Sequence, residues 1–164
     1  MLRRFAIASF AVIALSASAH AQTWASAVTG SLLQAGAIGG ETSLGLQCSL
    51  KTRHDRWLGE MVFIYADGGQ SRPLKSVKLT FDNGKTVDIH DHGPTLKAER
   101  GKVRVAFGPD RARFSWFWSI AKNVAAANSV TVEVPELGIR DTVSLKGSSR
   151  AIQPILNNEC HPIW

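Results

Sequence analysis

The sequence predicts a mainly β fold, an antiparallel β-sandwich or partly closed barrel with a central helix and a short C-terminal helix. Three observations predict it. Short segments in which apolar and polar side chains alternate recur along the chain, as they do in half-buried strands. Short turns rich in Gly, Pro, Asn and Asp separate most of these segments, which favours antiparallel pairing. Apolar residues at helical spacing occur in two places, once between strands and once near the C-terminus.

The first 21 residues have the pattern of a secretory signal peptide. Arg3 and Arg4 precede an apolar run from Phe5 to Leu15, and a small-x-small cleavage site ends at Ala21. The apolar run is shorter than the ~20 residues that span a bilayer, so a membrane anchor is the weaker alternative. We therefore expect a protein of the periplasm, or one secreted to the cell surface, with a single mature domain over residues 22–164.

The mature domain is mildly basic. Without the first 21 residues, which hold two arginines and no acid, 143 residues remain with 17 basic and 13 acidic side chains, a net charge of +4. This length suits one domain with a real hydrophobic core. The charge is compatible with anionic envelope surfaces and is too small and dispersed to indicate nucleic acid.

The N-terminal part of the domain predicts three strands. Trp24 and its small neighbours fit a first strand, although the apolar residues within 32–35 also fit a short helical turn. In Ser43–Cys48 alternate residues are apolar, so Cys48 points into the core with two leucines. After a charged loop, Trp57–Ile64 is apolar in both phases, which is compatible with cover on both of its faces.

The middle of the chain contains the strongest hairpin signal. The alternating segments Val77–Phe81 and Thr86–His90 flank Asn83-Gly84, and these two residues accept the positive φ that a tight turn needs. Residues 91–100 read as a polar connection. Lys102–Phe107 is a further alternating strand, which Gly108-Pro109 ends.

The last third predicts a helix, a hairpin and a second helix. The first helix has Ser115 as its candidate cap and an apolar face of Phe117, Ile120, Ala121 and Val124. Strands over 130–134 and 139–145 then pair across a turn at Pro135–Gly138. Ser148 or Ser149 caps the second helix, whose apolar face holds Ala151, Ile152, Ile155 and Leu156. In all we expect about seven or eight strands and two helices.

The two cysteines, Cys48 and Cys160, predict a disulfide, because an even pair in an oxidising compartment is usually bridged. The bridge would close a loop of about 113 residues and stabilise the fold by about 4 kcal/mol on the chain-entropy model. A metal or redox site is the alternative. Neither cysteine lies in a Cys-x-x-Cys motif, and one thiol beside His161 is a weak ligand set.

Several of these features recur in one order over nearly the whole mature chain: Trp24, the Leu-Gly-Leu-Gln-Cys strand that ends at Cys48, the strand and turn of Val77–Gly84, an aromatic helix, Val-Thr-Val-Glu-Val, and a strand-Gly-helix ending at Cys160. This order resembles the invasion-associated locus B family of exported proteins. It is also similar to small secretion-associated accessory proteins that share the Leu-x-Cys strand and the same ending.

The resemblance implies a periplasmic or outer-envelope β-sandwich-like protein without known catalysis, linked in some members to host-cell association or stress survival. It carries over Cys48 and Cys160 as the bridge and offers no catalytic residue. The aromatic run Trp116–Trp118 and the tail His161–Trp164 match no family pattern.

Two groups of residues are candidates for partner binding. Three consecutive aromatic residues cannot all face the core from a helix, so Trp116 is expected at the core margin, where core packing is the alternative to an exposed contact. The basic side chains of Arg53, Arg56, Lys102 and Arg104 would form an anion-binding face if they converge; a solvated surface is the alternative.

His90 and His92 are weak metal-ligand candidates. Two histidines at this spacing lie on one side of an extended segment, together with Asp88, and suit Zn²⁺ or Cu²⁺. An exposed polar loop is the simpler interpretation, so we expect neither metal nor cofactor. The chain has no Gly-x-Ser-x-Gly motif, and the pairing of Glu60, Asp82 or Glu99 for hydrolase chemistry is invisible in one sequence.

These observations favour a non-enzymatic exported envelope protein that binds a protein or an envelope component, in the context of host association or stress survival. The alternative is an accessory protein of a secretion or envelope assembly system. A periplasmic metal-binding protein or hydrolase is a distant third. The expected partner is an envelope or secretion-system protein, or an anionic surface component.

Overall fold

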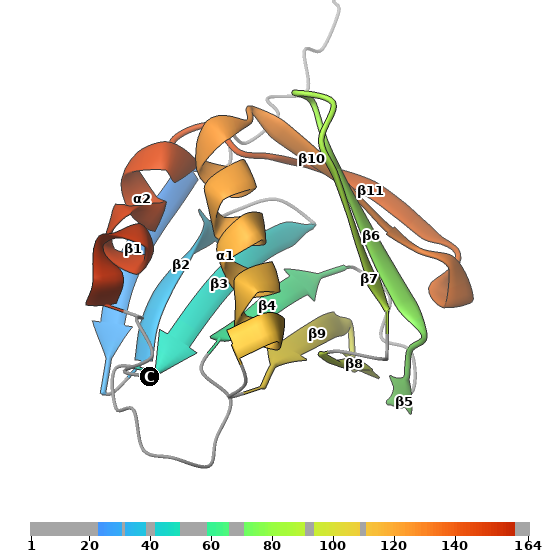
Figure 1. The fold of residues 1–164 in the computed structure, drawn as a ribbon. Coiled ribbons are helices and arrows are strands. Elements are labelled where there is room, and N and C mark those ends of the chain that lie inside the picture. Colours follow the sequence, from blue (N-terminus) through green and yellow to red (C-terminus); the bar gives the residue numbers. More distant parts are fainter. Residues whose placement is uncertain are drawn as a thin grey trace, which may run out of the picture.

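Strands form two antiparallel sheets in this protein. The computed structural model describes residues 23–30, 32–38, 42–49, 59–65, 71–90, 94–108 and 111–159. The strands of this part of the chain are β1 (Thr23–Thr29), β2 (Leu32–Ile38), β3 (Ser43–Ser49), β4 (Gly59–Ile64), β5 (Arg72–Pro73), β6 (Ser76–Phe81), β7 (Thr86–His90), β8 (Thr95–Glu99), β9 (Lys102–Phe107), β10 (Ser129–Val134) and β11 (Ile139–Ser144). The large sheet has the order β1-β2-β3-β4-β9-β8-β5, and the small sheet has the order β11-β10-β6-β7 (Figure 1). Neither sheet closes into a barrel.

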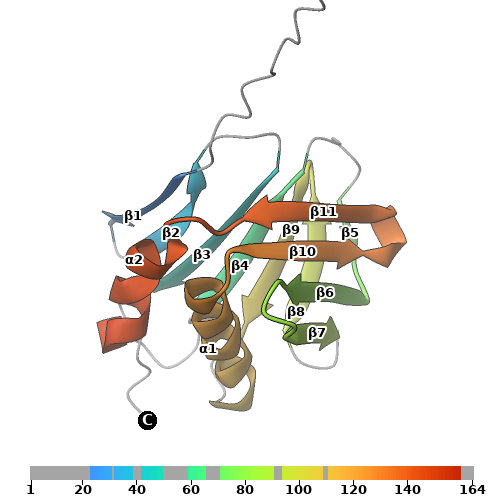
Figure 2. The ribbon, with the colours of Figure 1, turned by 90° about the horizontal axis from the view of Figure 1, so that it is seen from above.

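The helices of the described residues lie on the same side of the large sheet as the small sheet does (Figures 1 and 2). They are α1 (Arg111–Ala126) and α2 (Ser148–Pro154), which continues as a π-helical turn, η2 (Ile155–Glu159). Helix α1 packs on β4 and β9, and α2 packs on β1 and β2. The small sheet lies over the remaining part, its strands crossing those of the large sheet at a steep angle (Figure 2). The opposite side of the large sheet, called the outer face below, carries no described helix or strand.

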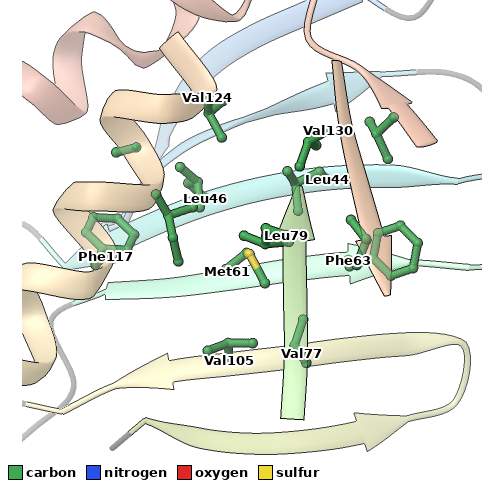
Figure 3. Close-up of a cluster of buried hydrophobic side chains, with 14 of the residues drawn as sticks. Leu44, Leu46, Met61, Phe63, Val77, Leu79, Val105, Phe117, Val124 and Val130 are labelled. Carbon is green, nitrogen blue, oxygen red and sulfur yellow. The ribbon is translucent and has the colours of Figure 1, made fainter. Parts of the chain in front are cut away.

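The core fills the space between the two sheets and α1 (Figure 3). Period-2 alternation supplies it: alternate residues of β3, β9 and β10 are buried along the whole strand. From the helix side, the ring of Phe117 packs against that of Phe107, with the ring centroids 5.7 Å apart. It also lies over Gly59, where a β-carbon would come within 2.8 Å of the ring. The absence of a side chain at Gly59 therefore allows α1 to dock closely on β4.

Both predicted hairpins are confirmed. In the β6–β7 hairpin Gly84 has a φ of +82°, and its N–H donates to the carbonyl oxygen of Phe81. The β10–β11 hairpin turns through a 3₁₀ turn, Pro135–Leu137, and Gly138 at a φ of +65°. The predicted face of the central helix is fully buried. On the predicted face of the C-terminal helix, Ala151, Ile152 and Ile155 are buried and Leu156 is partly buried.

The N-terminal part and residues 91–100 differ from the sequence expectation. Residues 32–35, which also fitted a helical turn, belong to strand β2, which pairs with β1 along its whole length. Part of the supposed polar connection is strand β8, paired with β9 through a tight turn at Arg100 and Gly101, both at positive φ. With the two-residue β5, the described residues contain eleven strands rather than seven or eight.

Three local expectations are wrong. Helix α1 begins at Arg111, so Ser115 is not its cap. Helix α2 has Gly147 as its N-cap and no side-chain cap; Ser148 instead donates from its Oγ to the carbonyl oxygen of Val124 and so ties α2 to α1. Strand β4 is covered on one side only among the described elements, and Ile64 is 41% exposed on the outer face.

Candidate outer-face site

A groove of about 670 Å³ runs over the outer face of the large sheet. Its floor is low because small residues occupy the outer phase of neighbouring strands. Gly36 of β2 lies opposite Gly45 of β3 on one side and opposite Ala25 of β1 on the other. Farther along, Val62 and Ile64 of β4 supply a larger apolar margin. The groove is lined by Ala25, Ser26, Ala27, Gln34, Ala35, Gly36, Ala37, Gly45, Leu46, Gln47, Glu60, Val62, Ile64, Glu99, Lys102 and Arg104.

A row of hydrogen-bonded polar side chains borders the groove. Gln34 on β2 donates from Nε2 to Oε1 of Gln47 on β3, at 3.0 Å. Gln47 in turn donates from its own Nε2 to Oε2 of Glu60 on β4. The antiparallel register makes these contacts, because Gln34 pairs with Gln47 and Gln47 pairs with Glu60.

Arg104 on β9 continues this row across the sheet. Its Nε donates to Oε1 of Glu60 at 2.5 Å, and its Nη1 donates to Oε2 of Glu99 at 3.2 Å. The other oxygen of Glu99 lies 2.6 Å from Nζ of Lys97. We call this set, Gln34, Gln47, Glu60, Arg104, Glu99 and Lys97, the polar row.

The contacts within the polar row shift the pKa values of Arg104 and Glu99. The hydrogen bond that Arg104 donates to Glu60 raises the pKa of Arg104 above its usual value, and the hydrogen bond that it donates to Glu99 adds to the effect. The hydrogen bonds from Lys97 and then Arg104 lower the pKa of Glu99. The side chain of Glu60 is only 3% exposed, so its charge depends on Arg104 and Gln47 for compensation.

This arrangement suits binding better than proton transfer. A general acid or base works best with a pKa near the operating pH, whereas the pKa of Glu99 is lowered. Both carboxylate oxygens of Glu60 already accept hydrogen bonds. A small-residue floor with an apolar margin, bordered by fixed polar groups, has the apolar-centre and polar-rim pattern of protein interfaces.

The structure brings together two of the predicted partner-binding residues and separates a third. Lys102 and Arg104 both line the groove, but two carboxylates neutralise Arg104, so the predicted basic face is a mixed-charge surface here. Trp116 is 36% exposed, at the core margin as predicted, on α1. Because α1 covers the opposite side of the sheet, Trp116 and Lys102 do not form one surface. Arg53 and Arg56 lie outside the described residues.

Cys48 is fully buried on β3, as its phase predicted. Cys160 lies outside the described residues, so the bridge stays a prediction. The described chain ends at Glu159 in η2, which packs on β2, the strand whose Leu33 pairs with Cys48. Residues 1–22, with the predicted signal peptide, also lie outside the described part.

The remaining titratable candidates are dispersed. On β7, Nε2 of His90 lies 3.4 Å from Oδ1 of Asp88, and both side chains are exposed. His92 is outside the described residues. Within the described chain, no group of three or more His, Cys, Asp or Glu residues could hold a metal ion. Asp82 accepts a hydrogen bond from the backbone N–H of Asn128, which lowers its pKa, and so fastens the β6–β7 turn to the start of β10.

Sequence reasoning missed Gln34 and Gln47 and left the pairing of Glu60 and Glu99 open. The sequence contains a signal for the Gln34–Gln47 and Gln47–Glu60 contacts, because these three residues follow one another at intervals of 13 residues, each in the polar phase of its strand. In antiparallel strands connected in succession, residues that are equally far from the intervening turn pair with each other, and the observed register places these three side chains side by side.

In the described residues, no helix is both long and apolar enough to cross a membrane. Comparison of the chain with protein-family models, with curated proteins and with solved structures finds no match. Its function is therefore argued from its own residues.

Proposed function

We propose that this protein is a non-enzymatic exported envelope protein that binds a partner protein through the outer face of its large sheet. The observation that carries the proposal is the groove on that face, with its small-residue floor and its polar row. Exposed apolar surface bordered by polar groups marks interaction sites on soluble proteins. Ile64, 41% exposed beside the groove, is the apolar residue best placed to enter such an interface.

The polar row supports this role physically. Side chains that are already hydrogen-bonded to one another lose little conformational freedom when a partner arrives, which lowers the entropic cost of association. Lys102, which lines the groove and has no ion pair among the described residues, offers a positive charge for partner recognition.

The proposed location rests on residues 1–21 and on the two cysteines. A signal peptide cleaved after Ala21 would place the mature chain in the periplasm or at the cell surface, where a Cys48–Cys160 bridge is stable. The mass of the protein purified from a periplasmic extract tests both points. A mature chain starting at Gln22 and lacking two thiol hydrogens is expected; an uncut or fully reduced chain would contradict this part of the proposal.

Site-specific photo-crosslinking in intact cells tests the binding face. A photoreactive amino acid is placed at Ile64, at Trp116 and, as a control, at Thr142 on the exposed side of the small sheet. A crosslinked protein partner is expected from Ile64 and not from Thr142. Identical products from both positions, or none from Ile64, would contradict the proposal. Products from Trp116 alone would assign the interface to α1.

A groove-filling variant provides the second arm of the test. A β-carbon at Gly45 meets only backbone atoms at 3.7 Å and beyond, which is ordinary contact, so Gly45→Leu fills the groove without displacing the strand. Its melting temperature should stay close to that of the wild type, while the crosslink from Ile64 is lost. Thr142→Leu is the matched control and should leave the crosslink intact.

A further inference from the structure

The free edge of strand β1 differs from the other sheet edges of the described chain. Strand β5 is two residues long and contains a proline, β7 contains Asp88 and His90, and β11 contains Arg140 and Asp141. Short strands, prolines and charges are the devices that prevent edges from pairing with other chains. Strand β1, Thr-Trp-Ala-Ser-Ala-Val-Thr, has seven residues and none of these devices.

The edge is also accessible. Every residue of β1 except Trp24 is exposed, including Val28 at 58%. Because β1 pairs only with β2 among the described strands, alternate residues of β1 direct their N–H and C=O groups away from the sheet. Those groups are available to the backbone of an added strand.

Strand β1 is held firmly despite this exposure. Trp24 is buried beneath α2, and its Nε1 donates to the carbonyl oxygen of Ser144 at 3.0 Å, which ties β1 to the end of β11. The pairing with β2 continues over all seven residues. An added strand would therefore meet a preformed template, which lowers the cost of ordering on association.

A hollow of about 650 Å³ lies beside the Trp24 end of this edge, and its charged residues are both basic. It is lined by Thr23, Trp24, Ala25 and Ser26 of β1 and by Lys146, Gly147, Arg150 and Ala151. Lys146 and Arg150 are exposed and have no ion pair within the described residues. This end of the edge therefore favours a carboxylate on the incoming chain.

We infer that β1 accepts an added β-strand from a partner protein, an extended segment that carries carboxylates where it passes Lys146 and Arg150. The inference rests on the proposed function, because it names the class of partner. Antiparallel addition, the mode of every strand pair described in this fold, places the acidic end at the C-terminal end of the added strand. A second copy fits less well, because β1 contains no carboxylate that could lie beside Lys146 and Arg150 in a β1–β1 pair.

Fluorescence anisotropy with labelled peptides tests the inference on the oxidised mature protein. The probe is a nine-residue peptide of alternating Thr and Val that ends in Glu-Glu, compared with the same peptide ending in Lys-Lys. The wild type should bind the acidic peptide roughly tenfold more tightly, since two exposed ion pairs together contribute about that factor. The variant Lys146→Glu/Arg150→Glu should reverse the preference, and 1 M NaCl should abolish it.

Two N-methylated forms of the acidic peptide test strand pairing itself. Each has methyl groups on alternate amides, so each lacks N–H donors along one edge. Addition to β1 uses one peptide edge, so one form should lose binding and the other should keep it. Equal binding of both forms, no preference between acidic and basic peptides, or no binding at 1 mM peptide would overturn the inference. So would a dimer in sedimentation that Val28→Lys dissociates.

Failure of this inference can be told from failure of the proposed function. The strand addition should survive Gly45→Leu, because Gly45 is two strands away from the free edge of β1. A crosslink at Ile64 without peptide binding would leave the outer-face proposal standing and remove β1 as the strand acceptor. Peptide binding without that crosslink would support β1 and remove the outer face.

Discussion

Removing the cation from the polar row should leave a buried charge uncompensated. In the variant Arg104→Met, Glu60 keeps its hydrogen bond from Gln47 and loses the guanidinium that lies 2.5 Å from its Oε1. The side chain of Glu60 is 3% exposed, so water cannot replace the missing partner.

The expected loss of stability in Arg104→Met lies between two limits. Breaking a fully buried ion pair costs about 3–5 kcal/mol, and breaking an exposed pair costs about 0–1 kcal/mol. The side chain of Arg104 is 40% exposed, so solvent screens part of the interaction. We expect the free energy of unfolding to fall by about 1–3 kcal/mol, which lowers the melting temperature by about 4–10 °C for a domain of this size.

Urea unfolding of three further variants, Glu60→Gln, Glu60→Gln/Arg104→Met and Lys78→Met, supplies the controls. Glu60→Gln/Arg104→Met removes both charges, so most of the lost stability should return and the two changes should be non-additive. Lys78→Met breaks the exposed Lys78–Glu133 pair of the small sheet, whose N–O distance is 4.0 Å, and should change stability by less than about 0.5 kcal/mol. The reasoning is refuted if Arg104→Met matches Lys78→Met, or if the double variant is less stable than Arg104→Met.

Three other predictions concern the core, pH and the bridge. Gly59→Ala should cost about 1–3 kcal/mol in urea unfolding, because its methyl group would lie 2.8 Å from the Phe117 ring; a smaller loss when Phe117→Leu is already present would confirm the overlap. Ionised Glu99 stabilises the fold above its unfolded pKa, near 4.5, and this contribution is lost as the pH falls through its lowered folded pKa. Glu99→Gln should therefore flatten the decline of the melting temperature below pH 4.5; an unchanged decline would exclude this cause. Reduction of the predicted Cys48–Cys160 disulfide should lower the free energy of unfolding of the wild type by about 4 kcal/mol and leave that of Cys48→Ser unchanged. Equal responses of the two proteins would argue against the bridge.

The alternation in the sequence was sufficient to predict most of the strands and the two helices. Where one face of a strand is buried and the other is exposed to solvent, apolar and polar residues alternate along the sequence, as in β10. The Asn83-Gly84 turn and the apolar face of α1 were predictable for the same reason, since local backbone and burial demands select the residue types. Trp116 at the core margin followed from the geometry of three consecutive aromatics on one helix.

Strand β8 shows where local pattern ceased to be sufficient. Its Thr, Lys and Glu outnumber its two apolar residues, Leu96 and Ala98, so the segment reads as a polar connection. Pairing with β9 makes it a strand, because that pairing satisfies its backbone groups and buries both apolar side chains.

What the sequence by itself determined is thus which residues face the core, because burial acts on each residue through its own hydrophobicity. Only the tertiary structure decided which charged residues of the polar row meet. The distances between Glu60, Arg104 and Glu99 depend on strand order and register. Strands β4 and β9 are neighbours although 37 residues separate Ile64 from Lys102, and the pattern of neither strand shows that they pair. The free edge of β1 is likewise a property of strand order, since an edge exists only where the sheet ends.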